Sequence, residues 1–436
     1  MENRVFIIAV VLSACLILWS IPSAGASDKA ASPNASDKVE DINTPPEQTV
    51  KLIFIHHSCG ENWLSDADGG LGMALRDNNY YVSDTNYGWG PDGIGDNTDI
   101  GHWWTWFIGP NSDTYLDALY TEYGDHSYNY SRLADPDANR ENEIIMFKSC
   151  FPNSYLGGNT DDPATVGNNP LRGQPAYRDD LGEPNSDLTV ANAKGIYNDI
   201  LDYFALNQDK LFVVITAPPL GENDTDADHA ANARAFNTWL VFNWLSTYPY
   251  DNVAVFNCFH VLTSNGGDTN TNDAGQEQGN HHRWWNGSVQ HLQTVINDYS
   301  AYGSDAWDSH PTAAGNEKAT DEFVPLLNVF YNTWKASTVA EGNPDGNLPT
   351  NYSLEQNFPN PFNASTRIRF SLPRTTVVEL RVYDLLGKEV ELLLSEQRQA
   401  GIHEVVWNAD DAPSGIYLIR LEAGGYTETK KLILQK

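Results

Sequence analysis

Short apolar runs recur along the middle of the chain, and each is bounded by polar or turn-forming residues. Four of them stand out, at 50–55, 144–147, 211–216 and 253–256. Runs of this length are typical of strands buried on both faces of a parallel sheet. We therefore predict four such strands.

Apolar residues at helical spacing lie between and after these runs. Ile196, Ile200 and Phe204 repeat every four residues before the third run. Similar patterns cover 236–244, before the fourth run, and 323–334, after it. Strands that alternate with helices predict an α/β fold, a doubly wound parallel sheet in three layers like that of flavodoxin. In such sheets, ligands bind at the carboxyl ends of the strands.

The pattern changes after residue 350. Alternating apolar and polar residues at 367–370, 379–383, 404–407 and 416–419, with turns between them, predict a small antiparallel all-β sandwich over 351–436. Residues 336–350 are rich in Gly, Asn and Pro and predict a linker. The sheet and its helices are then expected to span 50–335.

The first residues have the pattern of a signal peptide. Arg4 precedes an apolar run at 5–19, and small residues at 24–26 resemble a cleavage site, so we predict a signal peptide over 1–26. Residues 27–49 are rich in Ser, Asp, Asn and Pro and predict a disordered linker. The apolar run is shorter than the roughly 20 residues that a membrane span needs, and no stable membrane span is expected.

The net charge and the cysteine content limit the partners that the protein can bind and the disulfides that it can form. The formal net charge is −32, and almost all of it lies in the first 350 residues. A strongly acidic chain is a poor partner for nucleic acid, which we exclude. Cys59, Cys150 and Cys258 remain after signal-peptide cleavage and allow at most one internal disulfide, whose pairing stays open. Cys59 and Cys150 would meet if the strands that precede them are neighbours.

Four motifs mark the C-terminal segment. They are QNFPNPFN at 356–363, YDLLGK at 383–388, GIY at 415–417 and KKLIL at 430–434. Together they resemble the C-terminal sorting domain of type IX secretion substrates. The resemblance implies that the signal peptide directs passage through the inner membrane. The type IX machinery would then bind residues 351–436 and export the chain across the outer membrane, so that it is secreted or held at the cell surface.

Two polar residues near the ends of the α/β region suit nucleophilic catalysis. Ser58 lies on the turn after the first strand, where its hydroxyl is exposed and a following helix can offer N–H groups to an oxyanion. His310 lies on a loop before the closing helix, from which it can approach that turn as general base. Asp308 or Asp305 would then orient its ring.

Four short sequence blocks, around Ser58, Gly88, Asn153 and His310, resemble those of the SGNH (GDSL-like) hydrolase superfamily. The resemblance implies an oxyanion hole built from the Ser58 N–H, Gly88 or Gly90, and Asn153, and it needs no cofactor and no metal. The chain departs from the family pattern at three places. Histidines stand in place of Gly-Asp before the serine, Trp307 stands where the family has its Asp, and Asn153 is all that remains of Gly-x-Asn-Asp.

Aromatic residues cluster in the loops between these blocks, and aromatic faces stack on sugar rings. We expect the substrate to contact His57, Trp89, Trp103, Trp104, Trp284 and Trp285. The sequence thus predicts a secreted or cell-surface serine esterase that deacylates, and specifically deacetylates, a carbohydrate. Two alternatives for the same residues are a metal site formed by His56-His57, His281-His282 and His310, and a Cys59 nucleophile. A third is a non-catalytic glycan-binding or adhesive protein on a hydrolase-like fold.

Overall fold

The computed structural model describes residues 42–127, 129–134, 140–178, 183–265, 279–305, 308–342, 349, 351–398, 401–410 and 412–436. The predicted signal peptide and most of the linker at 27–49 lie outside these residues. The end of that linker does make specific contacts: the Asn332 Nδ2 donates to the carbonyl oxygens of Ile42 and Thr44, both at 2.9 Å. The prediction of disorder therefore does not hold for these last residues.

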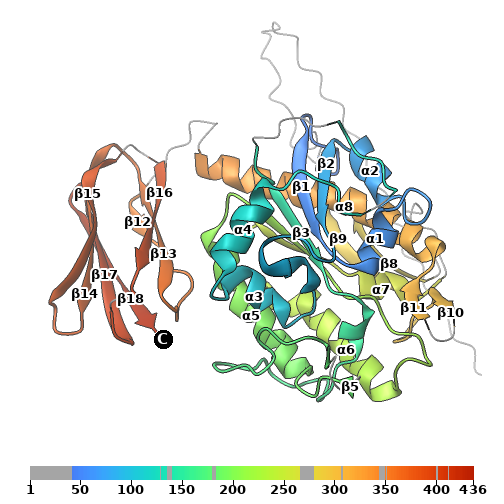
Figure 1. Cartoon of the computed structure of the whole chain (residues 1–436). Coiled ribbons are helices and arrows are strands. Elements are labelled where there is room, and N and C mark those ends of the chain that lie inside the picture. The colour runs from blue at the N-terminus through green and yellow to red at the C-terminus, as the bar shows by residue number, and fades with distance from the viewer. Residues whose placement is uncertain are drawn as a thin grey trace, which may run out of the picture. The chain divides into compact units, whose positions relative to one another are not determined.

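The α/β region is built on a five-stranded parallel sheet in the order β2-β1-β3-β6-β7 (Figure 1). Its strands are β1 (Val50–Ile55), β2 (Tyr80–Thr85), β3 (Ile144–Lys148), β6 (Leu211–Ile215) and β7 (Val253–Phe256). Counted along the chain, the order is 2-1-3-4-5, as in flavodoxin-like sheets. The direction of winding reverses between β1 and β3, and the crevice at such a reversal is where ligands bind. The predicted fold class is confirmed.

Helices cover both faces of the sheet, as the labels in Figure 1 show. One face packs against α3 (His102–Ile108), α4 (Ser112–Thr121), α5 (Val190–Leu206) and α6 (Ala227–Trp239). The other packs against α1 (Ser58–Leu64), α2 (Leu71–Asp77), α7 (Cys258–Leu262) and α8 (Ala313–Gly342). All residues of the five strands have their side chains buried, which explains the continuous apolar runs.

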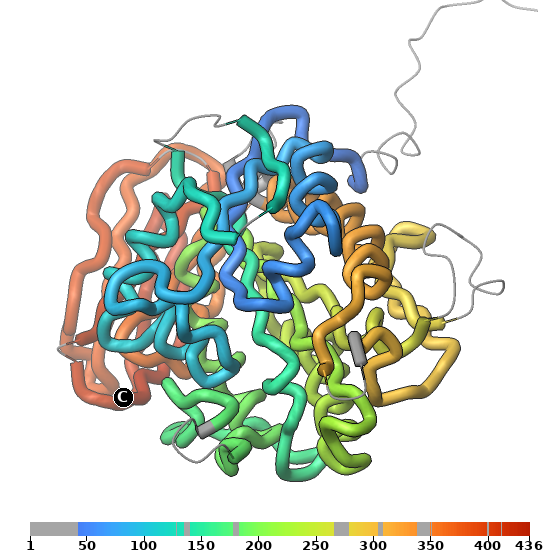
Figure 2. The backbone as a smooth tube through the Cα atoms, turned by 45° about the vertical axis from the view of Figure 1, so that its right-hand side comes forward, coloured from blue at the N-terminus to red at the C-terminus, as the bar shows by residue number. Residues whose placement is uncertain are grey.

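Shorter elements lie outside the five-stranded sheet. They are the turns of helix η1 (Pro91–Asp96), η2 (Phe151–Ser154) and η3 (Leu240–Trp244), and the strand pairs β4 (Tyr177–Arg178) with β5 (Glu183–Pro184), β8 (Asn280–Trp285) with β9 (Ser288–Gln293), and β10 (Gly303–Asp305) with β11 (Asp308–Pro311). β10 and β11 directly precede α8. Figure 2 traces the chain from β1 in blue to α8 in orange.

The C-terminal region forms two antiparallel sheets, in the orders β12-β13-β16 and β15-β14-β17-β18. Their strands are β12 (Ser353–Leu354), β13 (Ser365–Leu372), β14 (Thr376–Asp384), β15 (Glu389–Arg398), β16 (Gly401–Asn408), β17 (Gly415–Ala423) and β18 (Tyr426–Leu434). Trp407, Ile368 and Ile419 lie in the apolar core between the sheets. The predicted all-β sandwich is confirmed.

One boundary differs from the sequence prediction. The linker predicted to begin at residue 336 is helical over its first part, because α8 continues to Gly342. Residues 336–342 contain no proline and include Ala336, Ala340 and Glu341, which favour a helix.

Candidate active site

The end of β1 leads directly into a helix that begins with Ser58. His56 and His57 follow the last residue of the strand, and Ser58 is the first residue of α1. This turn stands at the carboxyl edge of the sheet, beside the β1–β3 reversal. The turn is tight because Gly60 packs on His56: a Cβ at Gly60 would lie 2.4 Å from the His56 Cβ.

We therefore expect Gly60→Ala to destabilise the fold by about 1–3 kcal/mol, the usual range for an added methyl group in a filled core. The displaced turn should also lower the activity that depends on Ser58. Urea unfolding of the variant measures the first effect. Gly157→Ala is the matched control, because a Cβ there meets its nearest neighbour at an ordinary 3.6 Å. Equal stability of both variants would contradict the tight turn.

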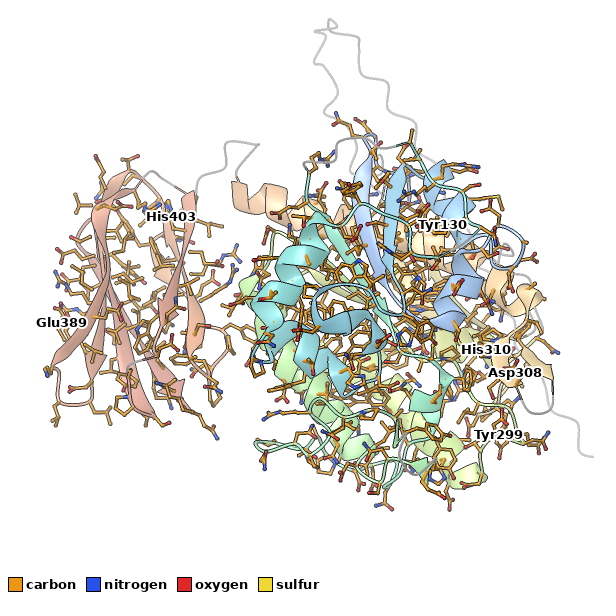
Figure 3. All side chains as sticks on the ribbon, in the orientation of Figure 1. Tyr130, Tyr299, Asp308, His310, Glu389 and His403 are labelled. Atoms are coloured by element: carbon orange, nitrogen blue, oxygen red, sulfur yellow. The ribbon has the colours of Figure 1, made fainter. Side chains whose placement is uncertain are left out.

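Ser58, His310 and Asp308 form a continuous hydrogen-bonded chain. The Ser58 Oγ lies 2.8 Å from the His310 Nε2, and the His310 Nδ1 lies 2.5 Å from the Asp308 Oδ1. Figure 3 shows His310 and Asp308 beside each other on the segment that precedes α8. A residue 252 positions away in sequence is thus brought to the nucleophile candidate by the fold. This arrangement lets His310 accept a proton from Ser58 while a carboxylate holds the opposite ring nitrogen.

The β10–β11 pair fixes the orientation of the imidazole. The Asp308 Oδ1 accepts both the His310 backbone N–H, at 2.9 Å, and the ring Nδ1–H. The edge of the His310 ring also meets the ring of Phe151, with centroids 4.8 Å apart. Asp305, the other predicted acceptor, pairs with Asp308 across β10 and β11, and its side chain lies outside what the structure describes.

Asp308→Asn should lower kcat for the reaction of Ser58 about 100-fold, because an amide favours the wrong tautomer of His310. The effect is kept moderate because the Asp308 side chain is 45 % exposed and water can replace part of its contact. Asp305→Asn is the matched control and should retain kcat within about threefold, well below the loss expected from a triad member. A larger loss in Asp305→Asn than in Asp308→Asn would reverse the assignment.

Tyr87 covers the serine, although it is not among the residues that the sequence predicted to contact substrate. Its hydroxyl lies close to the Ser58 side chain and to the Ser58 N–H, and burial raises its pKa. Its ring stacks on His57 at 4.0 Å, yet 60 % of the residue is exposed. His57 is held in turn by a 2.6 Å bond from its Nε2 to the Gly95 carbonyl oxygen, and burial lowers its pKa. His57 therefore supports Tyr87 as a neutral imidazole.

Two of the predicted oxyanion donors are already engaged. The Gly88 N–H donates to the Asp96 Oδ1 at 2.8 Å. The Asn153 Nδ2 donates to the Asp99 Oδ1 at 2.6 Å and to the Cys150 carbonyl oxygen at 3.3 Å, and Asn153 is fully buried. In this arrangement neither group points a spare N–H at Ser58. Gly90 precedes η1 with a φ of +76° and lies in the same loop as Gly88.

The tryptophans predicted to contact substrate are either buried or half-buried. Trp103 is fully buried and donates its Nε1–H to the Ser149 Oγ at 3.0 Å, so the expectation that it touches substrate is corrected. Trp89 is 7 % exposed, and its Nε1–H donates to the Glu122 Oε2 at 2.7 Å. Trp104 is half-buried beside the guanidinium of Arg172, 5.9 Å from its ring.

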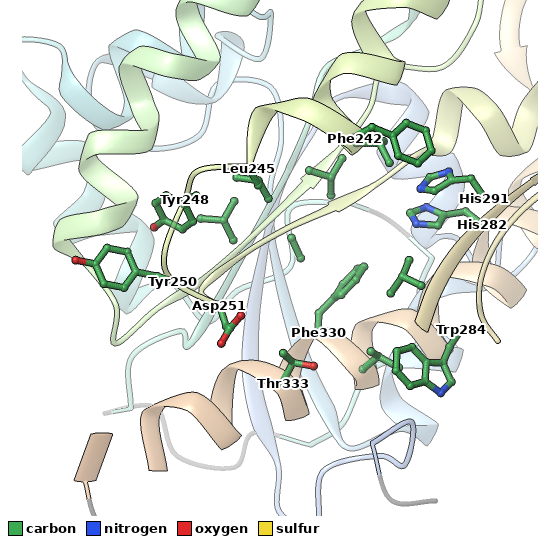
Figure 4. Close-up of a pocket in the computed structure, with 16 residues that line it drawn as sticks. Phe242, Leu245, Tyr248, Tyr250, Asp251, His282, Trp284, His291, Phe330 and Thr333 are labelled. Carbon is green, nitrogen blue, oxygen red and sulfur yellow. The ribbon is translucent and has the colours of Figure 1, made fainter. Parts of the chain in front are cut away.

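Trp284 belongs to a different pocket, of about 450 Å³, drawn in Figure 4. This pocket lies against the edge strand β7, and His282, His291 and Phe242 also line it. Trp285 follows on the same strand, β8, half-buried beside the guanidinium of Arg283. Both tryptophans are thus on the β8–β9 hairpin.

The alternatives weighed from the sequence depend on side chains that are buried. His56 is bonded to the Asp84 Oδ2 at 3.2 Å, and His281 to the Glu322 Oε1 at 3.0 Å. Among the residues that the structure describes, no three His, Cys, Asp or Glu side chains gather as metal ligands would. The Cys59 thiol is 1 % exposed, which denies it access to a substrate.

The C-terminal sandwich has a recognised family. Residues 356–435 match the family described as the secretion system C-terminal sorting domain. No curated protein matches the chain at a significant level. Within the described residues, none of the helices has both the length and the apolar character of a membrane span.

Three solved structures are distantly similar to the chain. Latent PorU from Porphyromonas gingivalis is 23 % identical, with a TM-score of 0.17, over 21 % of this chain and 10 % of that one. The endo-beta-1,4-mannanase from Thermotoga petrophila is 11 % identical, with a TM-score of 0.19, over 87 % and 62 %. An acetyl xylan esterase from the rumen bacterium Butyrivibrio proteoclasticus is 13 % identical, with a TM-score of 0.22, over 48 % and 55 %. The chain spans less than two thirds of the length of each of these proteins.

The localisation therefore follows from the C-terminal segment alone. The chain carries a type IX secretion sorting domain at its C-terminus and is exported to the cell surface or the medium.

Proposed function

We propose that the α/β region is a serine esterase that removes acyl groups, specifically acetyl, from a carbohydrate outside the cell. The observation that carries the proposal is the chain of bonds from the Ser58 Oγ through His310 to Asp308, with lengths of 2.8 and 2.5 Å. It stands at the carboxyl edge of a parallel sheet, beside the reversal of winding. Ser, His and Asp in this order of contacts are the groups that acyl transfer requires.

The reaction would proceed in two halves. The Ser58 Oγ attacks the ester carbonyl carbon while the His310 Nε2 takes its proton, and the protonated imidazole then gives that proton to the departing sugar hydroxyl. Water next attacks the acyl-serine, with His310 as base, and releases the carboxylic acid. Asp308 keeps the Nδ1–H of His310 in place and stabilises the imidazolium in both halves.

The oxyanion would form beside the Ser58 N–H. The Tyr87 hydroxyl lies close to this N–H. An entering ester carbonyl oxygen would displace the hydroxyl and accept the Ser58 N–H. One such donor is worth about 3 kcal/mol in the transition state. Gly90 is the remaining predicted donor from the adjacent loop.

The carbohydrate part of the proposal rests on the surroundings of Tyr87. A groove of about 590 Å³ begins at Tyr87 and is lined by Trp89, Glu122, Tyr123 and His126. Tyr87 and Tyr123 are 60 % and 53 % exposed, which is unusual for aromatic residues. Exposed aromatic faces with carboxylate and imidazole groups between them suit a neutral sugar, whose ring stacks while its hydroxyls donate and accept hydrogen bonds.

The test is hydrolysis of an aryl acetate and of acetylated polysaccharides by the purified chain, together with labelling by a fluorophosphonate. The proposal predicts acetate release and covalent label on the peptide that contains Ser58. Label on another serine, or no hydrolysis of any ester, would overturn it. Release from the aryl acetate alone would keep the esterase and reject the acetylated sugar.

A second candidate is a glycan-binding protein without catalysis. The hydroxyl of Tyr87 favours it, since that group covers both the side chain and the N–H of Ser58. Glycan-array binding that is unchanged in Ser58→Ala, in a chain that hydrolyses no ester, would establish this candidate.

A further inference from the structure

Two of the three described thiols meet beside Ser58. β1 and β3 are neighbouring strands, with Ile55 opposite Phe147, so the segments that follow them run together. Cys59 is the second residue of α1, and Cys150 directly precedes η2. The two thiols are hydrogen-bonded to each other. In addition, the Cys59 sulfur accepts the Phe151 N–H, and the Cys150 sulfur accepts the Cys59 N–H.

The two thiols differ in reactivity. The hydrogen bond from Cys59, and next the positive charge of Lys148, hold the pKa of Cys150 well below its ordinary value. The same hydrogen bond, together with burial, raises the pKa of Cys59 well above its ordinary value. Cys150 is partly exposed, whereas Cys59 and Lys148 are buried. Cys150 is thus the thiolate of the pair and the one that a reagent can reach.

We infer that Cys59 and Cys150 form an intramolecular disulfide when the chain is exported. The Cys150 thiolate attacks one sulfur of a donor disulfide, either glutathione disulfide or a disulfide-bonded oxidoreductase, and releases one thiolate of the donor. Cys59 then gives its proton to a leaving thiolate and attacks the Cys150 sulfur of the mixed disulfide, which releases the second thiol. Two protein thiols are oxidised and one donor disulfide is reduced to two thiols. Export supplies the compartment, since such bonds persist outside the cytoplasm.

The bond would join two walls of the candidate active site. One wall is the start of α1 with Ser58, and the other is η2 with Phe151, whose ring meets His310. Lys148 stabilises the thiolate of the reduced form, which makes the disulfide easier to reduce than an ordinary structural one. The pairing depends on the thiols alone and does not require that Ser58 hydrolyses esters.

Peptide mapping of the full chain tests the pairing. The protein is reduced with dithiothreitol, exposed while folded to oxidised glutathione, then unfolded and alkylated. We expect a linked peptide that contains Cys59 and Cys150, with Cys258 alkylated, and loss of the link when dithiothreitol is added to the folded protein.

Two single variants serve as a matched pair. Cys258→Ala should leave the link intact, because Cys258 is buried at the start of α7 and burial raises its pKa to about 12. Cys150→Ala should abolish the link and leave Cys59 alkylated. Free Cys59 and Cys150 after oxidation, a mixed disulfide that stops at Cys150, or a link that includes Cys258 would each overturn the inference.

Discussion

Ser58→Ala and His310→Ala should each lower kcat for ester hydrolysis by a factor of about 10⁴ to 10⁶, the loss seen when one member of a serine–histidine unit is removed. The 2.8 Å contact between the Ser58 Oγ and the His310 Nε2 makes the two side chains one unit, since neither nucleophile nor base works alone. The double variant should therefore be no slower than either single variant. Initial rates on an aryl acetate, with circular dichroism to verify folding, measure all three.

Matched controls exist for both residues. His229 also pairs with a carboxylate, the Asp226 Oδ2 at 2.8 Å, and lies on the partly exposed start of α6. Ser112, like Ser58, is the first residue of a helix. His229→Ala and Ser112→Ala should keep kcat within about threefold, because neither touches the unit on which the large loss depends. If Ser58→Ala retained more than a tenth of the activity, another nucleophile would have to carry the reaction.

The sequence predicted the sheet well wherever strands consist of apolar residues alone. The runs that became β1, β3, β6 and β7 were found because both of their faces are buried. β2 was missed by its pattern because its second half is Ser83, Asp84 and Thr85. Asp84 can be buried there since it receives bonds from His56, Ser127 and Tyr130. Partners so far away in sequence cannot be read from the strand itself.

The candidate site, like the sheet, could be predicted from the sequence only in part. The approach of His310 to Ser58 could be predicted, because a parallel sheet brings the ends of its first strand and the start of its last helix to one edge. The choice of Asp308 could not, since it depends on the β10–β11 turn and on a bond to the His310 backbone. Trp103 was wrongly predicted to contact substrate. Its sequence context could have indicated burial, because Trp103, Trp106 and Phe107 have the three- and four-residue spacing of a buried helical face.

The free energy of unfolding should fall strongly at acid pH because of three buried histidines. Three histidines, His260 on α7, His282 on β8 and His291 on β9, lie against one another, with the rings of His282 and His291 stacked at 3.8 Å beside Phe242 (Figure 4). Burial lowers the pKa of His260 to about 4 and of His291 to about 3, and it lowers the pKa of His282 as well.

The hydrogen bonds of His260 and His282 are those that neutral imidazole rings make. The His282 Nδ1 accepts the Asn257 N–H at 3.0 Å, and the His260 Nε2 donates to the Leu292 carbonyl oxygen at 3.0 Å. The positive charges of Arg234 and Lys318 further disfavour protonation of His260. Arg234 is itself paired with the Asp298 carboxylate at 3.0 Å. A proton on the His282 Nδ1 would therefore lose the Asn257 contact, and a proton on His260 would meet the positive charges of Arg234 and Lys318.

The direction of the pH dependence follows from these depressed values. In the unfolded chain each histidine takes up a proton as the pH falls through about 6.5, whereas in the folded chain it stays neutral. The stability due to each neutral ring is complete above pH 6.5 and is lost between that pH and the folded pKa. From pH 8 to pH 5, the free energy of unfolding should fall by about 2 kcal/mol per histidine.

His291→Phe isolates one of these contributions. Phenylalanine keeps the stack on His282 and removes the buried Nδ1 of His291, which has no hydrogen-bond partner among the described residues. The variant should lose about 2 kcal/mol less than the parent between pH 8 and pH 5. Phe242→Leu, which changes the neighbouring ring at 5.0 Å but removes no titrating group, should lower stability equally at both pH values. Urea unfolding with hydrogen-exchange labelling of β6 measures the α/β region by itself. If His291→Phe shows the same loss as its parent, His291 is protonated in the folded chain and the buried cluster is open to water.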